Sequence, residues 1–345
     1  MILKNTKKIF KNKSVLITGG TGSLGKELVK ILIKEFSLKR LVVFSRDELK
    51  QSEMINFFGP HDKKKILRFF LGDVREISRM KIAMRDIDYV IHAAALKHVD
   101  IAEYNPLEFI NTNINGAKNI IEAALSCNVK KVIALSTDKA ANPINLYGAT
   151  KLVSDKLFVS ANNISGKQKT RFSVVRYGNV ANSRGSVLPF FIKLDKEKSK
   201  YFPITDYKMT RFWITLKDSA SLVLNSFFLM YGGEIFVPKL PSVKIIDLTK
   251  AISDKKKIKL VGIRPGEKLS EILCSKDEAV NTIEFKNHYL VKPSIKFVDQ
   301  KINYFFSKNK EKGKIVKKDF EYSSSNNFKF LTVMEIKKYI KNEFK

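Results

Sequence analysis

The chain has 345 residues, 44% of them hydrophobic and 11% aromatic, which is enough for one large or two modest globular domains with a sizeable core. Lys and Arg outnumber Asp and Glu by 64 to 34, which gives a formal net charge of +30. This excess suits anionic ligands. However, the lysines are scattered, without a DNA-binding motif or an aromatic-interleaved basic stripe, so we expect no nucleic-acid partner.

No apolar run in the sequence reaches the length of a membrane span, so we expect no membrane association. The basic residues 1–13 lead directly into a buried-strand pattern, without the apolar stretch and cleavage site of a signal peptide. We therefore expect a cytoplasmic protein. The two cysteines, Cys127 and Cys274, belong to no CxxC or Cys/His cluster, which argues against a disulfide framework and against a metal site.

Strands and helices are predicted to alternate through the first half of the chain. The predicted strands are 13–18, 40–45, 66–71, 89–92, 131–135 and 172–177, and the predicted helices are 24–36, 47–58, 79–85, 106–127 and 147–163. Alternation at this spacing is typical of a parallel, doubly wound α/β sheet of the Rossmann type. We place the dinucleotide-binding domain in residues 1–180.

The second half of the chain is less regular. Its patterns predict strands at 213–216, 234–237 and 257–261 and helices at 189–194, 216–231, 245–252 and 332–343. We predict a smaller mixed α/β substrate-binding region, 181–345, that interleaves with the first domain and closes over the cofactor cleft. The Lys-rich segment after residue 307 is predicted to form a surface latch before the terminal helix.

The first predicted strand runs into a glycine-rich turn, TGGTGSLG, that opens a helix. This context is the one in which such a pattern binds a dinucleotide, with the pyrophosphate at the helix N-terminus. Gly19 allows the tight turn, Gly22 lets the backbone approach the pyrophosphate, and Gly25 lets helix and strand pack closely. The residues that we assign to cofactor binding here are Gly19, Thr21, Gly22, Ser23, Leu24 and Gly25.

The second predicted strand ends in Ser45, Arg46, Asp47 and Glu48, where this fold reads the adenosine ribose. The Ser-Arg pair suits the 2′-phosphate of NADP, whereas an acidic residue favours NAD. We favour NADP. The two acidic residues leave NAD open, and they would equally serve to cap the next helix. The other residues that we expect along the cofactor are Asp73, Val74 and Ala93.

Residues 134–151, ALSTDKAANPINLYGATK, carry the candidate catalytic groups. Tyr147 and Lys151 are four residues apart and project from one helical face. A nearby ammonium stabilises a phenolate, so we expect Lys151 to lower the pKa of Tyr147, which would then be a general base for a sugar hydroxyl. By themselves, Asp138 and Lys139 fit either a solvated loop with a local ion pair or an acid–base pair.

Longer strings reveal a family resemblance that spans about residues 12–330. They are SRDELKQSEM, HAAALKHVDIAEYNP, STDKAANPINLYGATKL, VVRYGNVANSRGSV, MTRFWIT, IRPGEKL and FEYSSSNN. Together with the glycine motif they resemble the configuration-inverting UDP-N-acetylglucosamine 4,6-dehydratases, which are extended short-chain dehydrogenases/reductases. The similarity is closest to the first enzyme of pseudaminic acid synthesis, which serves flagellin glycosylation. The sequence departs from the family pattern at Asp100, Ala181 and Asn182. These departures would affect the shape of the loops near the sugar and leave the chemistry unaltered.

The resemblance implies a reaction in three parts on bound NADP⁺. The sugar is first oxidised at C4, as a base takes the O4 proton and hydride goes to the nicotinamide. A base then removes the C5 proton while an acid helps the C6 hydroxyl to leave as water. Hydride finally returns to C6 and a proton reaches the opposite face of C5, giving UDP-2-acetamido-2,6-dideoxy-β-L-arabino-hex-4-ulose.

The resemblance also implies roles for individual residues. Tyr147 would be the base at O4, Thr137 would hydrogen-bond O4, and Lys151 would also hold the ribose. Asp138 and Lys139 would supply an acid and a base next to C5 and C6, and which of them removes the proton and which donates one stays open. We favour Lys139 as the base at C5, for which burial and Lys151 would have to lower its pKa. Retaining relatives carry Asp-Glu after the Thr, so the Lys suggests inversion.

The substrate residues implied by the resemblance are Lys97, Lys139, Asn179, Arg211 and Arg264, with Lys97 also toward the cofactor. The implied substrate is UDP-N-acetylglucosamine. The implied assembly is a homo-oligomer in which helices 106–127 and 147–163 form a four-helix dimer contact, and near relatives assemble into hexamers. Two alternatives remain: the same or a related dehydratase or epimerase reaction in capsule or O-antigen synthesis, and a non-catalytic dinucleotide-binding regulator.

Overall fold

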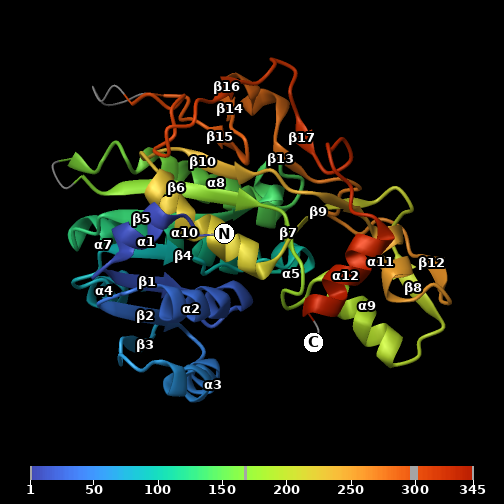
Figure 1. Ribbon diagram of the computed structural model, residues 1–345, viewed down its shortest axis with the longest axis horizontal. Helices are drawn as coiled ribbons and strands as arrows, with labels where there is room; N and C mark the ends of the chain where they lie inside the picture. The colour runs from blue at the N-terminus through green and yellow to red at the C-terminus, as the bar shows by residue number, and fades with distance from the viewer. Residues whose placement is uncertain (1, 167–168, 296–301, 344–345) are drawn as a thin grey trace.

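The computed structural model describes residues 2–166, 169–295 and 302–343, and a ten-stranded sheet forms its centre (Figure 1). The strand order is β16-β14-β15-β10-β6-β5-β4-β1-β2-β3. Every neighbouring pair from β3 to β10 is parallel, and β10 then pairs antiparallel with β15. The predicted Rossmann-type, doubly wound α/β fold is therefore confirmed.

Except for the edge strand β3, which is only partly buried, the parallel strands are buried on both faces, which explains their nearly continuous apolar sequences. They are β1 (Ser14–Thr18), β2 (Arg40–Ser45), β3 (Leu67–Leu71), β4 (Tyr89–His92), β5 (Lys131–Thr137), β6 (Arg171–Tyr177) and β10 (Ile235–Pro238). The helices beside them are α2 (Ser23–Glu35), α3 (Glu48–Phe58), α4 (Ile77–Ala83), α7 (Gly116–Ser126), α8 (Leu146–Ser160) and α10 (Leu216–Leu229). Helices α2 and α10 pack together on one face, and α4, α7 and α8 on the other (Figure 1).

The long helix predicted at 106–127 is divided in the structure. It consists of α6 (Pro106–Phe109), a π-helical segment (η2, Ile110–Asn115) and α7, and is preceded by α5 (Val99–Tyr104). The buried Asn113 side chain in the π segment donates to the carbonyl of Leu96 and to the hydroxyl of Thr150 on α8, and accepts from the Leu96 N–H. These hydrogen bonds link the π-helical segment to α8, and hydrophobic periodicity contains no signal for them.

A smaller mixed region lies beyond one end of the large sheet (Figure 1). Its strands are β7 (Asn179–Val180), β8 (Tyr201–Ile204), β9 (Thr210–Ile214), β11 (Ser242–Lys244) and β12 (Lys257–Leu260), and its helices are α9 (Val187–Lys196), α11 (Ile245–Ile252) and α12 (Val333–Glu343). Leu188, Phe202, Trp213, Leu248 and Ile336 belong to its separate apolar core. No helix in the described ranges is long and apolar enough to cross a membrane.

Several short elements were not predicted from the sequence. They are α1 (Lys4–Phe10), β8, β11, β13 (Ile272–Cys274), β14 (Thr282–Glu284), β15 (His288–Val291), β16 (Lys314–Ile315) and β17 (Tyr322–Ser323). Phe10 of α1 is buried against the rings of Phe36, Tyr89 and Phe227. Long-range contacts of this kind stabilise elements too short for a periodic signal.

A buried ion cluster lies behind helix α8. Arg176 of β6 is fully buried, and its guanidinium lies 3.4 Å from the Asp155 carboxylate of α8 and 2.8 Å from that of Glu278. It also donates to the carbonyl of Leu273, and Ser136 donates to Asp155 over 2.7 Å. The cluster therefore holds α8 and the carboxyl end of β5 in a fixed relation.

We predict that Arg176→Met lowers the free energy of unfolding by ~3–5 kcal/mol, because it leaves the Asp155 carboxylate buried and uncompensated. The matched control is Lys118→Met, which removes an exposed 3.7 Å pair with Glu122 and should change this free energy by about 0.5 kcal/mol or less. Urea denaturation followed by circular dichroism measures both. Equal effects of the two substitutions would contradict the prediction.

Candidate active site

The candidate catalytic residues gather at the carboxyl end of β5, where ligands bind in open α/β sheets. Thr137 ends the strand, and Asp138–Ala140 form a short 3-10 turn (η3). The Thr137 hydroxyl donates to Asp138 Oδ1 over 2.9 Å and accepts from the Lys139 N–H over 3.4 Å. Asp138 is only 1% exposed. The acid–base interpretation of this doublet is therefore favoured over a solvated loop.

Helix α8 begins directly against the η3 turn. Asn145 caps it by accepting from the Gly148 N–H, and its amide donates to the Gly266 carbonyl, both over 2.8 Å. A Cβ on Gly148 would lie 2.2 Å from the Lys139 carbonyl oxygen, so only glycine allows this approach. The close packing brings Tyr147, which is buried in the first turn of α8, beside Asp138 and Lys139.

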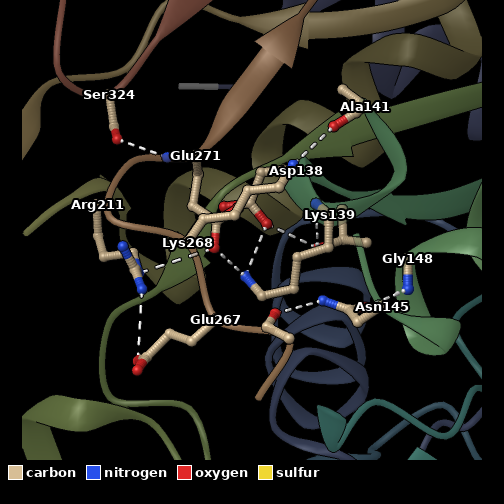
Figure 2. A network of polar contacts seen from close by, with 12 residues as sticks. Asp138, Lys139, Ala141, Asn145, Gly148, Arg211, Glu267, Lys268, Glu271 and Ser324 are labelled. Carbon is tan, nitrogen blue, oxygen red and sulfur yellow. Dashed lines mark hydrogen bonds and ion pairs between the residues drawn. The ribbon is translucent and has the colours of Figure 1, made fainter. Parts of the chain in front are cut away.

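Lys139 is held between two carboxylates, as Figure 2 shows. Its Nζ lies 3.2 Å from Asp138 Oδ1 and 2.8 Å from Glu271 Oε1. Arg211 of β9 extends the network, with Nε 3.8 Å from Glu271 Oε1 and a terminal nitrogen 3.6 Å from Glu267 Oε1. Sequence reasoning missed Glu271. The only sequence feature that could have indicated Glu271 is its position as an acidic residue directly before the apolar residues of β13.

We expected burial and Lys151 to lower the pKa of Lys139, and this was wrong. Burial alone does act in that direction, but the charges of Asp138 and Glu271 outweigh it and raise the pKa of Lys139 above its ordinary value. The side chain is therefore a charged ammonium in this arrangement. Burial raises the pKa of Asp138, with a further contribution from Glu271 and opposition from Lys139.

The expected effect of Lys151 on Tyr147 was also wrong. Burial raises the pKa of Tyr147 to about 12, and the opposing charge is that of Lys139 rather than that of Lys151. Lys151 is itself buried, and burial lowers its pKa while Asp155 opposes that change. The charge that opposes this rise in the pKa of Tyr147 therefore comes from the η3 turn.

The glycine-rich turn fits a dinucleotide. Gly19 has a φ of +65°, and a Cβ there would lie 2.9 Å from the Ala93 carbonyl oxygen, so the turn packs against the end of β4. A Cβ on Gly25 would lie 2.3 Å from the Gly20 carbonyl oxygen. Gly22 precedes α2 without a side-chain cap, which leaves the first N–H groups of that helix for a pyrophosphate. Thr21 is buried, and Ser23 and Leu24 open the helix.

Most of the residues predicted to read the ribose are already engaged by neighbouring side chains. Asp47 caps α3 by accepting from the Lys50 N–H, and its other oxygen pairs with the Lys50 ammonium, while Glu48 is the first residue of the helix. Ser45 is buried, and Arg46 is half exposed, 3.3 Å from Asp73. The cap alternative is therefore confirmed for Asp47.

The remaining predicted residues lie in different parts of the structure. Val74 is buried against Gly116, and Lys97 donates to the Arg184 carbonyl over 3.0 Å. The Arg184 N–H donates to the Ser23 hydroxyl over 3.2 Å, so this loop of the smaller region reaches the cofactor turn. Asn179 Oδ1 is buried and has no hydrogen-bond partner among the described residues. Arg264 lies exposed in the loop after β12, and its backbone N–H donates to the carboxylate of Glu267 over 3.4 Å.

Comparison with known proteins places the chain in a family. The model of the family described as "Polysaccharide biosynthesis protein" matches residues 15–293. The chain belongs to this family. It is 55% identical to the "UDP-N-acetylglucosamine 4,6-dehydratase (inverting)" of Campylobacter jejuni over 95% of this chain and 97% of that relative. The resemblance predicted from the sequence strings is therefore confirmed.

Other members of this fold carry different names. Pen from Bacillus thuringiensis matches with a TM-score of 0.86 at 36% identity, over 97% of this chain and 99% of that structure. A UDP-glucose 4-epimerase of Rickettsia bellii is 41% identical over 97% of both chains. Since proteins with different named activities share this length and architecture, the activity of the present chain has to be argued from its site.

Because Gly148 packs closely on Lys139, we predict that replacement by Ala changes the free energy of unfolding differently at Gly148 and at Gly59. Gly148→Ala should lower the free energy of unfolding by ~1–3 kcal/mol, because the new Cβ has to displace the η3 turn. Gly59→Ala should leave it unchanged or raise it by up to ~1 kcal/mol, because Gly59 has helical dihedrals and nothing within 4 Å of a Cβ. Urea denaturation compares them, and a neutral Gly148→Ala would contradict the prediction.

Proposed function

We propose that the protein is a configuration-inverting UDP-N-acetylglucosamine 4,6-dehydratase. The observation that supports this most is the pairing of the buried Asp138 with the partly buried Lys139 beside Tyr147, at the carboxyl end of a dinucleotide-binding sheet. An epimerase needs to oxidise and reduce C4 alone, whereas loss of water from C5 and C6 needs a further acid and base. The 55% identity to an enzyme of that name supports the same conclusion.

The residues divide the proton transfers among them. Tyr147 takes the proton from O4, aided by the nearby Lys139 charge and by Thr137. Asp138, whose pKa burial raises, is suited to protonate the departing C6 hydroxyl. Lys139 accepts the C5 proton as a neutral amine, so its ammonium first has to give up a proton, and a proton from a different donor then reaches the opposite face of C5, as inversion requires. When bound, the nicotinamide cofactor accepts hydride from C4 and returns it to C6.

We propose NADP as this cofactor. Arg46 is half exposed at the end of β2 and offers a guanidinium to a 2′-phosphate. Both oxygens of Asp47 are engaged by Lys50, which disfavours Asp47 as the acceptor for the free ribose hydroxyls of NAD. Lys151 and the glycine turn would hold the nicotinamide ribose and the pyrophosphate.

For the substrate we propose that Arg211 and Arg264 contact the diphosphate, and that Lys97, Lys139 and Asn179 contact the sugar or the first phosphate. The unpartnered, buried Asn179 Oδ1 supports a ligand contact at that position. Arg264 has to reach the ligand from an exposed loop, so its contact requires closure of that loop.

We further propose a cytoplasmic homo-oligomer that begins pseudaminic acid synthesis for flagellin glycosylation. Large apolar side chains on the helices of the predicted dimer contact are exposed and support it: Leu107 and Val153 are 69% and 41% exposed. Capsule or O-antigen synthesis would use the same reaction. A non-catalytic regulator is disfavoured, because it has no need of the buried acid–base pair.

Incubation with UDP-N-acetylglucosamine in D₂O tests the proposed reaction. We expect a 4-keto-6-deoxy product without added reductant, with deuterium at an inverted C5, detected by NMR. Lys139→Ala should bind the cofactor normally but form product at least about 10²-fold more slowly. Retained configuration at C5 would contradict the proposal. Formation of UDP-N-acetylgalactosamine would instead support a 4-epimerase, the name carried by the relative from Rickettsia bellii.

Arg46→Ala tests the cofactor. We expect the dissociation constant of NADP to rise about 10- to 100-fold, because a charge-assisted contact to the phosphate is lost, while that of NAD stays the same. Isothermal titration calorimetry measures both constants. Arg68→Ala is the matched control, since this arginine donates to the carbonyls of Lys65 and Leu67 at the other end of β3. Equal weakening of NAD and NADP would contradict the assignment.

A further inference from the structure

Glu271 lies outside the residues that the family strings singled out, yet it makes the shortest ion pair of Lys139. Its Oε1 is 2.8 Å from the ammonium, against 3.2 Å for the Asp138 oxygen, and its side chain is 2% exposed. Glu271 Oε2 and Asp138 Oδ2 are both buried without a hydrogen-bond partner among the described residues. Two buried carboxyl groups and one partly buried ammonium therefore lie within ion-pair distance, where charge has larger effects than in water.

The backbone of Glu271 is fixed from a distant part of the chain. Its N–H donates to the Ser324 hydroxyl over 2.9 Å, and its carbonyl accepts from the Ser324 N–H over 2.8 Å. The same hydroxyl lies 2.9 Å from that of Thr210, next to Arg211 (Figure 2 shows the Ser324 contact). Strand β17, which holds Tyr322 and Ser323, pairs with β13 just after Glu271. The carboxylate is thus presented to Lys139 by a rigid support.

A simpler explanation is that Glu271 neutralises Arg211. The distances favour Lys139 over Arg211, because Glu271 Oε1 is 2.8 Å from the ammonium but 3.8 Å from Arg211 Nε. Arg211 also has a second acid, Glu267, at 3.6 Å. The carboxylate that Lys139 would otherwise depend on is Asp138, which the proposed reaction uses as an acid. A third group is therefore needed to keep the ammonium in place when Asp138 carries a proton.

We propose that Glu271 is a positioning residue that fixes the Lys139 ammonium and supplies the negative charge that keeps the proton on Asp138. This inference rests on the proposed dehydratase function and deepens it. The directions of the pKa shifts agree with it. Burial alone would raise the pKa of Glu271, but Lys139 and Arg211 hold it below its ordinary value, whereas burial and Glu271 together raise the pKa of Asp138.

Several charged or titratable groups act on this centre from the elements packed around it. They are Asp138 of η3, Tyr147 of α8, Arg211 of β9, and Lys268 and Glu271 of the segment before β13. Within this set the Glu271 carboxylate raises the pKa of both Asp138 and Lys139. Removal of its charge should therefore make both groups release their protons at lower pH.

Glu271→Gln tests the inference because it removes the charge and keeps the shape. We expect kcat with UDP-N-acetylglucosamine at neutral pH to fall about 10- to 100-fold, with KM within about threefold. We also expect the pH range of highest kcat to move to lower pH. Glu271→Asp restores the charge, so its pH range should return toward that of the wild type.

Glu267→Gln is the matched control, because Glu267 pairs with Arg211 but forms no ion pair with Lys139 among the described residues. It should raise KM and leave the pH range of kcat where it is. The proposal is overturned if Glu271→Gln behaves like this control, with a raised KM and an unmoved pH profile. Thermal unfolding of each variant shows that the fold is retained.

A substrate-free measurement separates this inference from the proposed function. The Lys139 signal in protein labelled with [ε-¹³C]lysine is identified by its loss in Lys139→Arg. In Glu271→Gln we expect this signal to begin to titrate at lower pH than in the wild type, and an unchanged titration overturns the inference. If the wild type forms no dehydrated product, the proposed function fails, and the NMR titration still decides the role of Glu271.

Discussion

The site depends on an ammonium that is enclosed by protein and must therefore be paired. Lys139 lies at the carboxyl end of the parallel sheet, and a buried charge is tolerated only when counter-charges lie close to it. Asp138 comes from the same turn, so it follows Lys139 wherever the turn is placed. Glu271 comes from the smaller region and has to be delivered by folding. The ion pair therefore couples the two parts of the molecule at the point where chemistry is proposed.

One short segment neutralises two separate buried cations. Glu271 precedes β13 and pairs with Lys139, and Glu278 follows it and pairs with Arg176, while the Leu273 carbonyl within the strand also accepts from Arg176. The pair of Glu271 and Lys139 contacts the η3 turn. The cluster around Arg176 holds α8 through Asp155. Misplacement of β13 would take from each cation the closer of its two carboxylates, and the backbone of this segment is fixed by β17 and Ser324.

Close backbone approach is the second requirement of the site. Gly148 allows α8 to pack on the Lys139 carbonyl, and Gly19 and Gly25 allow the phosphate-binding turn to pack on β4 and on itself. Because α8 carries Tyr147, the distance between the phenol and the acid–base turn is set by the absence of one side chain. The charge that opposes the effect of burial on the pKa of the phenol then comes from Lys139 of the turn.

The sequence alone determined the alternating sheet, the glycine turn and the set Thr137, Asp138, Lys139, Tyr147 and Lys151, because strand and helix periods and motif strings are local. Only the tertiary structure decided the protonation of these groups. Glu271 lies far along the chain from Lys139, and the short strands that deliver it carry no periodic signal. The pKa of Lys139 was mispredicted for the same reason: burial could be anticipated from the sequence, but the distant carboxylate that outweighs it could not.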